Sequence, residues 1–428
     1  MTPKEIRDKD KDIHAFLEVF EDPAPEQAWY GAGALSGKTI SIKDNLLLEG
    51  HKASAGSKIL ENFTAISDAT VIRKIKEAGA IIVGRTNMDE FGMGSSTENS
   101  AYGVTKNPHN LERVPGGSSG GAAASVAAGM CDMALGSDTG GSIRQPAAFC
   151  GVVGLKPTYG RVSRFGLIAY GSSLDQIGPL TKTVTDAEII YNVIKGEDFN
   201  DSTSINDDTY PNKKKFNKTI GIPRDFVGSE GVSGEVKKSF KEAEDKLKTL
   251  GYEIHDIKLP SLKYSLSAYY IIALAEASAN LARFDGVKYG LHVDGENSID
   301  DYFKTRGAGF GKEVRRRIIL GTYVLSSGYY DAYYGKAIAV RKKITQELRE
   351  AFKKYDLIVL PTTPNGAWKI GEKSSDPVET YIEDIFTVPV NIAGIPAISI
   401  PNNLQLWADL GREDNLFRAG KEFLGEIE

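Results

Sequence analysis

The chain of 428 residues carries 52 Lys and Arg against 57 Asp and Glu, a net charge of −5, with 41% hydrophobic and 25% charged residues. This composition is typical of a globular protein and excludes disordered and fibrous classes, and the negative balance argues against a strong electrostatic surface for nucleic acid. Two cysteines, Cys131 and Cys150, exclude a disulfide scaffold and fit a reducing, cytoplasmic location. No apolar run approaches the roughly 18 residues of a membrane span, and the start of the chain lacks the apolar region of a signal peptide.

Apolar spacing in the first part of the chain predicts alternating strands and helices. The expected order is a strand at 39–42, a helix capped by Ser67 or Asp68, a strand at 80–83, a helix at 122–130, and a strand beginning at 133. The helix at 122–130 consists mainly of Ala, Ser and Gly, so we expect it to pack closely against its neighbours.

The same alternation continues through the second half. Thr185 and Glu188 form a capping box that predicts the start of a helix, and the polar stretch 196–218 predicts a surface loop. The later expected elements are strand 220–222, helix 236–250, strand 252–254, helix 331–354, strand 357–360, and a hairpin of 397–401 and 404–407 around a two-residue Asn402–Asn403 turn. Helices alternate with strands throughout, so we predict one α/β domain.

Glycine is the compositional exception, at 45 of 428 residues, and it is concentrated between 84 and 178. Two segments, 115–121 and 136–146, each place serine inside a glycine-rich loop beside a predicted helix. Such loops present backbone N–H groups to an anion, and a helix N-terminus adds partial positive charge. Two flexible turns are the alternative, but two loops that both pair Gly-Gly with Ser favour a site.

Three other motifs are weaker. Gly117-x-Ser119-x-Gly121 matches a nucleophile elbow, but neither His255 nor His292, the later histidines, lies in an evident catalytic loop. The segment 33–39 is one residue short of a P-loop and precedes a strand instead of a helix. The five histidines are scattered, so we expect no metal site.

A lysine can replace histidine as a base if it is neutral. Lys43 follows the strand at 39–42, and burial there would lower its pKa. From position alone, a solvated lysine at the end of the strand remains the alternative.

Five segments decide between these possibilities. They are 43–45, 116–121, 136–144, 151–158 and 174–179, and together they resemble the amidase signature family. The resemblance extends from about residue 36 to the C-terminus, with the signature core at about 36–180. It implies a single α/β domain, 36–428, with a large twisted mixed sheet covered by helices on both faces. Residues 1–35 would be a short N-terminal extension.

The resemblance also implies the catalytic residues. Ser142 would be the nucleophile that forms the acyl-enzyme, Lys43 the terminal base and acid, and Ser118 the proton relay between them, in an unusual cis peptide. The N–H groups of Thr139, Gly140 and Gly141 would hold the oxyanion. Ser119 would have a supporting role.

Three more segments, 87–98, 276–286 and 326–334, resemble the branch of the family that hydrolyses glutamine for tRNA-dependent amidotransferases. This implies a ligase-type enzyme that releases ammonia to convert Glu-tRNA(Gln) to Gln-tRNA(Gln). Arg317 would bind the carboxylate of glutamine and Asp384 its ammonium, with Tyr269 lining the pocket. Arg316 and Tyr270 remain alternatives for Arg317 and Tyr269.

The implied enzyme is a heterotrimer. Its B subunit would bind tRNA and use ATP and Mg²⁺, and its small C subunit would hold the other two together, so this chain would need no cofactor. A stand-alone amidase and a catalytically silent scaffold are the alternative functions. The chain departs from the family pattern in its short region before Ser36, where the usual opening helices are mostly missing, and in its short loop at Asn402–Asn403.

Overall fold

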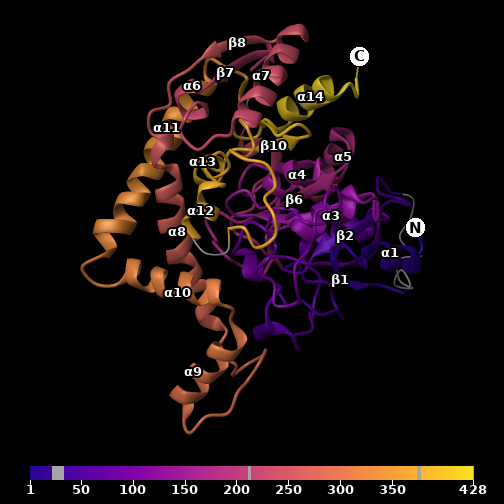
Figure 1. Cartoon of the computed structure of the whole chain (residues 1–428), viewed down its shortest axis with the longest axis vertical. Helices are drawn as coiled ribbons and strands as arrows, with labels where there is room; N and C mark the ends of the chain where they lie inside the picture. The colour runs from indigo at the N-terminus through magenta and orange to yellow at the C-terminus, as the bar shows by residue number, and fades with distance from the viewer. Residues whose placement is uncertain (22–32, 211–213, 374–376, 428) are drawn as a thin grey trace.

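The computed structural model describes residues 1–21, 33–210, 214–373 and 377–427, and these form one mixed sheet surrounded by helices (Figure 1). The strand order in the sheet is β1-β3-β2-β4-β6-β5-β10-β11-β9-β7-β8. The strands are β1 Phe16–Val19, β2 Thr39–Lys43, β3 Ile81–Thr86, β4 Met133–Asp138, β5 Val153–Lys156, β6 Gln176–Thr181, β7 Thr219–Ile222, β8 Glu253–Asp256, β9 Leu357–Pro361, β10 Ala397–Ile400 and β11 Leu404–Trp407.

The sheet combines parallel and antiparallel pairs, as predicted. Strand β2 runs parallel to both β3 and β4, and β7 runs parallel to β8 and β9. The centre from β4 through β6, β5, β10, β11 to β9 is antiparallel. Because β2 and β4 are parallel neighbours, their carboxyl ends lie at the same edge of the sheet, which brings Lys43 close to the loop after Asp138.

Successive side chains of β4 point to opposite faces of the sheet and pack in two separate hydrophobic clusters. Met133 and Leu135 of β4 pack in the larger cluster, whereas Ala134 between them packs with α1, α3 and α4 in the smaller one. This follows from the period of two along a strand, and it means that helices cover both faces of the sheet.

Fourteen α-helices lie within the described residues, several of them long. They are α1 Pro3–Asp10, α2 Thr70–Glu77, α3 Gly120–Ala127, α4 Arg144–Cys150, α5 Val184–Ile194, α6 Arg224–Val227, α7 Gly234–Thr249, α8 Ser265–Asn280, α9 Ser298–Gly309, α10 Lys312–Leu325, α11 Lys336–Phe352, α12 Pro377–Ile382, α13 Val388–Ala393 and α14 Glu413–Leu424. In the part of the chain described, no helix is long and apolar enough to cross a membrane.

Helices α8 to α11 form an assembly beside the sheet, with α9 projecting furthest from it (Figure 1). Helices α8 and α10 approach closely at Gly321, where an added Cβ would lie 1.9 Å from the carbonyl oxygen of Leu274. A side chain at 321 would therefore force the two helices apart.

Several predicted boundaries were wrong. Helix α5 is capped by Thr183, whose hydroxyl accepts the N–H of Asp186, so it begins before the predicted Thr185 box. Helix α2 has Ala69 as its N-cap, because Asp68 instead accepts the N–H of Glu49.

The hairpin loop has three residues, since Ile400 pairs with Leu404, although Asn402 and Asn403 do adopt positive φ. The predicted helix at 331–354 begins with a π-helical turn, Asp331–Gly335.

The segment 1–35 contains both regular structure and undescribed residues. Strand β1 pairs antiparallel with β3 and so belongs to the sheet, and α1 contributes Ile6 to the smaller core. Residues 22–32 of this segment lie outside the described part of the chain.

Candidate active site

Lys43 is the last residue of β2, and its side chain is buried. Its Nζ lies 2.7 Å from Ser118 Oγ, 2.9 Å from Ser119 Oγ and 2.9 Å from Ser137 Oγ. Burial lowers the pKa of Lys43 to about 7, against the opposing charges of nearby aspartates. The solvated strand-end alternative is therefore wrong, and burial favours the neutral form of Lys43.

Ser118 lies in the loop before α3, and the Gly117–Ser118 peptide is cis, as the resemblance implied. The N–H of Gly117 donates to Gln145 Oε1 at 2.8 Å, and an added Cβ at Gly117 would lie 2.2 Å from Asp89 Oδ2. Only glycine fits at this position. The loop lies between Asp89 and Gln145 on one side and Lys43 on the other, and the N–H of Asp89 also contacts the Ser118 carbonyl at 3.4 Å.

Ser142 lies between β4 and α4 and is partly exposed. Its carbonyl oxygen accepts the N–H of Ser119 at 3.1 Å, which joins the two glycine-rich loops. The structure thus brings both serine loops together with Lys43, and it leaves the Ser142 side chain accessible to a substrate.

Asp138 organises the loop that carries Ser142. Its carboxylate accepts the N–H groups of Gly141 at 2.9 Å and Ile143 at 3.1 Å, and it forms a buried ion pair with Arg144. Burial alone would raise the pKa of Asp138, but the charge and hydrogen bonds of Arg144 hold it at about 2. The ionised side chain of Asp138 therefore fixes the conformation of the loop that carries Ser142.

The three predicted oxyanion donors differ in their surroundings. The N–H of Gly141 already donates to Asp138, whereas those of Thr139 and Gly140 form no hydrogen bond within the described residues. The Thr139 hydroxyl donates to Asp175 at 2.6 Å, which fixes the start of the loop. Thr139 and Gly140 are therefore the better candidates for oxyanion binding.

Arg317, on α10, is buried and faces the interior of the helical assembly. Its Nε donates to Glu313 at 2.7 Å and its Nη1 to the hydroxyl of Tyr170 at 2.7 Å. Arg316, by contrast, is partly exposed and pairs with Glu313 from outside. Of the two alternatives, the geometry favours Arg317 as the cation of the pocket.

Asp384 follows α12 and is buried beside the same group. It accepts a hydrogen bond from Tyr270 at 2.7 Å and one from Ser95 at 3.2 Å. Burial raises the pKa of Asp384 to about 7, while the Tyr270 hydroxyl and the charge of Arg317 act in the opposite direction. A cationic group arriving beside it would favour the ionised form.

Tyr269 and Tyr270, both on α8, have different contacts. Tyr270 bonds Asp384, whereas Tyr269 lies against the loop of Ser142, because an added Cβ at Gly140 would lie 2.3 Å from the Tyr269 hydroxyl. Both therefore line the region between Asp384 and the catalytic loop, and Tyr269 is the one that contacts the loop.

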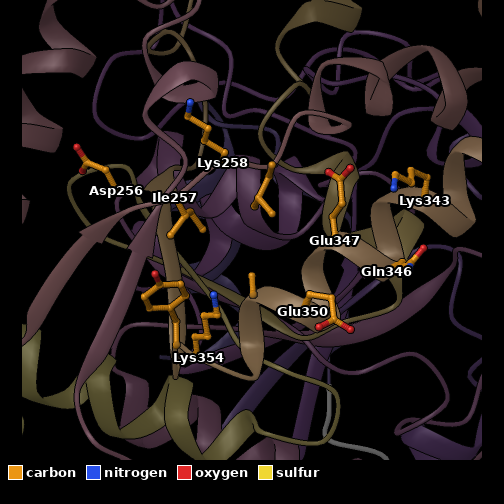
Figure 2. A pocket seen from close by; sticks show the side chains of 11 residues that line it. Asp256, Ile257, Lys258, Lys343, Gln346, Glu347, Glu350 and Lys354 are labelled. Atoms are coloured by element: carbon orange, nitrogen blue, oxygen red, sulfur yellow. The ribbon is translucent and has the colours of Figure 1, made fainter.

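A cavity of about 360 Å³ reaches Arg317, but Asp384 and the serine loops do not line it. Its lining residues are Gly94, Ser96, Glu98, Asn99, Val104, Lys312, Glu313, Arg316, Arg317, Lys373, Thr380 and Tyr381. Figure 2 shows a second hollow, of about 460 Å³, between the end of β8 and α11, and none of the predicted site residues lines it. In the described part of the chain, no cluster of three or more His, Cys, Asp or Glu could hold a metal ion.

Sequence reasoning missed several residues of this site. Ser137 contacts Lys43 and also accepts a hydrogen bond from Asn45 at 2.9 Å. Tyr170 and Glu313 hold Arg317, yet no motif indicated either. Only the i, i+4 spacing of Glu313 and Arg317 could have suggested their pairing.

The fold, with buried Lys43 bonded to Ser118 in a glycine-rich loop, is that of an amidase-type enzyme, and a family model described as Amidase matches residues 3–410. The chain therefore belongs to the amidase family. It is 54% identical over 415 residues to the A subunit of glutamyl-tRNA(Gln) amidotransferase from Geobacillus sp. (strain WCH70), covering 93% of this chain and 85% of that protein. The corresponding protein of Nostoc punctiforme is 51% identical, with 95% and 89% covered.

The fold of the chain also matches solved structures of related proteins. The crystal structure of the A subunit of glutamyl-tRNA(Gln) amidotransferase from Thermotoga maritima superposes with a TM-score of 0.82 at 45% identity, covering 98% of this chain and 90% of that one. A structure described only as an amidase superposes equally well, at 0.82, but is 29% identical, with 100% and 97% covered.

Proposed function

We propose that this chain is the glutamine-hydrolysing subunit of a glutamyl-tRNA(Gln) amidotransferase, supplying ammonia for the amidation of Glu-tRNA(Gln). The proposal rests on Arg317 and Asp384, two buried charged residues that both contact Tyr270, together with the hydrogen bond between Lys43 and Ser118. A zwitterionic amino-acid head needs one cation and one anion, whereas a plain amide needs neither. Two relatives that are 54% and 53% identical to this chain over the aligned region are named as the A subunit of glutamyl-tRNA(Gln) amidotransferase.

The catalytic step that we infer starts from the hydrogen bond between Lys43 and Ser118. Neutral Lys43 accepts the proton of Ser118, which accepts the proton of Ser142 as that oxygen attacks the side-chain amide of glutamine. The N–H groups of Thr139 and Gly140 stabilise the oxyanion of the tetrahedral intermediate. The proton then returns through Ser118 to the leaving nitrogen, so ammonia departs and a glutamyl ester remains on Ser142.

Deacylation uses the same groups in reverse. Water replaces ammonia, Lys43 takes its proton through Ser118, and the resulting attack on the ester releases glutamate and restores the Ser142 hydroxyl. No metal or organic cofactor takes part in these steps.

The head of glutamine is held at the other end of the pocket. The Nη2 group of Arg317 makes no hydrogen bond within the described residues and can donate to the substrate carboxylate. Asp384 pairs with the ammonium group, and the tyrosines of α8 separate these contacts from the reacting amide.

The rest of the enzyme would be supplied by partners. A tRNA-binding B subunit would use ATP and Mg²⁺ and accept the ammonia, and a small C subunit would join the two, in the cytoplasm. The net charge of −5 on this chain fits a tRNA held mainly by the partner.

Ammonia release from glutamine, measured with and without tRNA and the partner subunits, tests the proposal. We expect weak activity from the chain alone and a marked rise in the complete assembly. Full hydrolysis of simple amides by the isolated chain, without a preference for glutamine, would instead identify a stand-alone amidase. Absence of turnover in the assembly would identify a silent scaffold.

A further inference from the structure

Glu313 is a buried carboxylate that the proposed reaction does not use. It lies in the first turn of α10, where the helix dipole favours a negative charge, and its side chain is only 9% exposed. Its Oε1 accepts hydrogen bonds from Arg317 Nε at 2.7 Å and from the Tyr381 hydroxyl at 2.8 Å. Its Oε2 pairs with Arg316. Both oxygens are therefore occupied by donors.

These donors come from the two elements that carry the charged residues of the pocket. Arg317 belongs to α10, whereas Tyr381 belongs to α12, and the N–H of Asp384 donates to the carbonyl of Tyr381 at 3.2 Å. Through its hydrogen bond with Tyr381, Glu313 thus connects α10, which carries Arg317, to the turn after α12, which carries Asp384. Tyr381 also stacks on Tyr270, the donor to Asp384, at 4.1 Å between ring centroids.

The orientation of Arg317 depends on the same contacts. Glu313 binds Nε and Tyr170 binds Nη1, so two edges of the guanidinium are fixed and Nη2 is directed elsewhere. The guanidinium also lies over the Tyr381 ring, 5.0 Å from its centroid. An arginine side chain otherwise has large rotamer freedom, which would be lost on each binding event.

We propose that Glu313 is a positioning residue that fixes Arg317 and Asp384 relative to each other, and so makes the pocket selective for a ligand with both an α-carboxylate and an α-ammonium group. This inference rests on the proposed function, because it deepens the account of the same site. Its consequence is that Glu313 contributes most to binding when a ligand uses both charged residues at once.

Substitution by glutamine is the sharpest test. The amide oxygen can still accept one or two hydrogen bonds, but the amide nitrogen would face Arg316, another donor, so the three contacts cannot all persist. Binding is measured by calorimetry in the assembled enzyme carrying Ser142→Ala, with and without Glu313→Gln. The ligands are glutamine, glutaramate, which lacks the ammonium group, and 4-aminobutanamide, which lacks the carboxylate.

We expect Glu313→Gln to weaken glutamine binding about 10- to 100-fold, the range for one charge-assisted hydrogen bond in a closed site. Glutaramate, which still uses Arg317, should lose less than glutamine, and 4-aminobutanamide, which does not use Arg317, should change less than about threefold. Tyr381→Phe, which removes one hydroxyl contact and keeps the stacked ring, should give the same pattern at smaller size. If Glu313→Gln does not fold, this second variant decides.

Glu235→Gln is the matched control, because Glu235 is also the second residue of its helix, α7, and is exposed. It should leave all three affinities and the unfolding temperature unchanged. Tighter binding of glutamine and glutaramate by Glu313→Gln would overturn the inference, since it would mean that Glu313 only competes with the substrate for Arg317. An equal loss for all three ligands would also overturn it, by indicating general loosening.

Glutamine binding by the Ser142→Ala parent distinguishes a failure of the proposed function from a failure of the positioning role alone. If the Ser142→Ala parent does not bind glutamine, both proposals fall. If the parent binds glutamine and Glu313→Gln changes nothing, only the positioning role falls.

Discussion

The catalytic residues and the residues that receive the substrate head are assembled in contrasting ways. Lys43, Ser118 and Ser142 come from the first third of the chain, at the ends of neighbouring strands and in loops where glycine permits close approach. Arg317 and Asp384 come from elements much later in the chain, and helix packing and side-chain hydrogen bonds between distant segments bring them together. In the proposed reaction, the first group performs acyl transfer and the second selects the substrate.

The two regions touch where Tyr269 lies against Gly140, and where the Thr387 hydroxyl, close to Asp384, donates to the Gly140 carbonyl at 2.6 Å. Changes on one side should therefore affect turnover, and changes on the other should affect binding, with little mixing. The following experiments test this separation.

Loss of the catalytic groups should have the largest effect. Ser142→Ala should abolish glutamine hydrolysis, Lys43→Ala should nearly do so, and Ser118→Ala should lower kcat by several orders of magnitude. Effects in double variants should not add, because the three residues act as one unit. Single-turnover ammonia release measures this. Near-normal turnover by Ser142→Ala together with loss in Ser119→Ala would instead support the nucleophile elbow.

Loss of the anion should come next. Asp384→Asn leaves the substrate ammonium unpaired in a closed pocket, which typically costs about 2–5 kcal/mol, so KM for glutamine should rise steeply. Amidation of Glu-tRNA(Gln) fed with free ammonium should be almost unchanged, since that route bypasses this chain's site. A matched fall in both assays would show that the substitution damages the assembly.

Dependence on pH should separate the two regions. Lys43 acts when neutral and Asp384 when ionised, and the pKa of each is about 7, so both active forms are lost as the pH falls below 7. The slope of log kcat/KM against pH should approach two in the acid limb for the wild type and one for Asp384→Asn. An unchanged slope in the variant would contradict the assignment of Asp384.

The smallest effect is expected for the cysteines. Cys131 and Cys150 are both buried, and burial raises the pKa of each thiol, so neither has the thiolate character of a nucleophile. A double substitution by Ala or Ser should retain turnover, with some loss of thermal stability. A folded double variant without activity would contradict the serine mechanism.

The catalytic region was predictable because its determinants are local. A strand ending in Lys43 and two glycine-rich serine loops can be recognised from short stretches of sequence, and the parallel pairing of β2 and β4 then brings them together. What the sequence left open was the state of Lys43, since burial depends on the entire fold. The structure resolved that question through the three serines around Nζ.

The head-group pocket was less predictable because its contacts are distant in sequence. Tyr170 is 147 residues from Arg317 and Glu313 is 68 from Tyr381, so no motif joins them. Arginine at 316 and at 317 cannot be distinguished by composition, because only the packing of α10 decides which one is buried. The predicted Thr185 cap failed for a related reason, as Thr183 and Asp186 satisfy the same capping pattern two residues earlier.

Gly321 has a consequence for how such a pocket can change. Arg317 lies one helical turn before the point where α10 meets the backbone of α8, and α8 carries both tyrosines of the pocket. A larger residue at 321 would push α10 away from α8. This would increase the distance between Arg317 and Tyr270 without changing either residue. We therefore expect the spacing of α8 and α10 at Gly321 to influence which substrates the proposed site accepts.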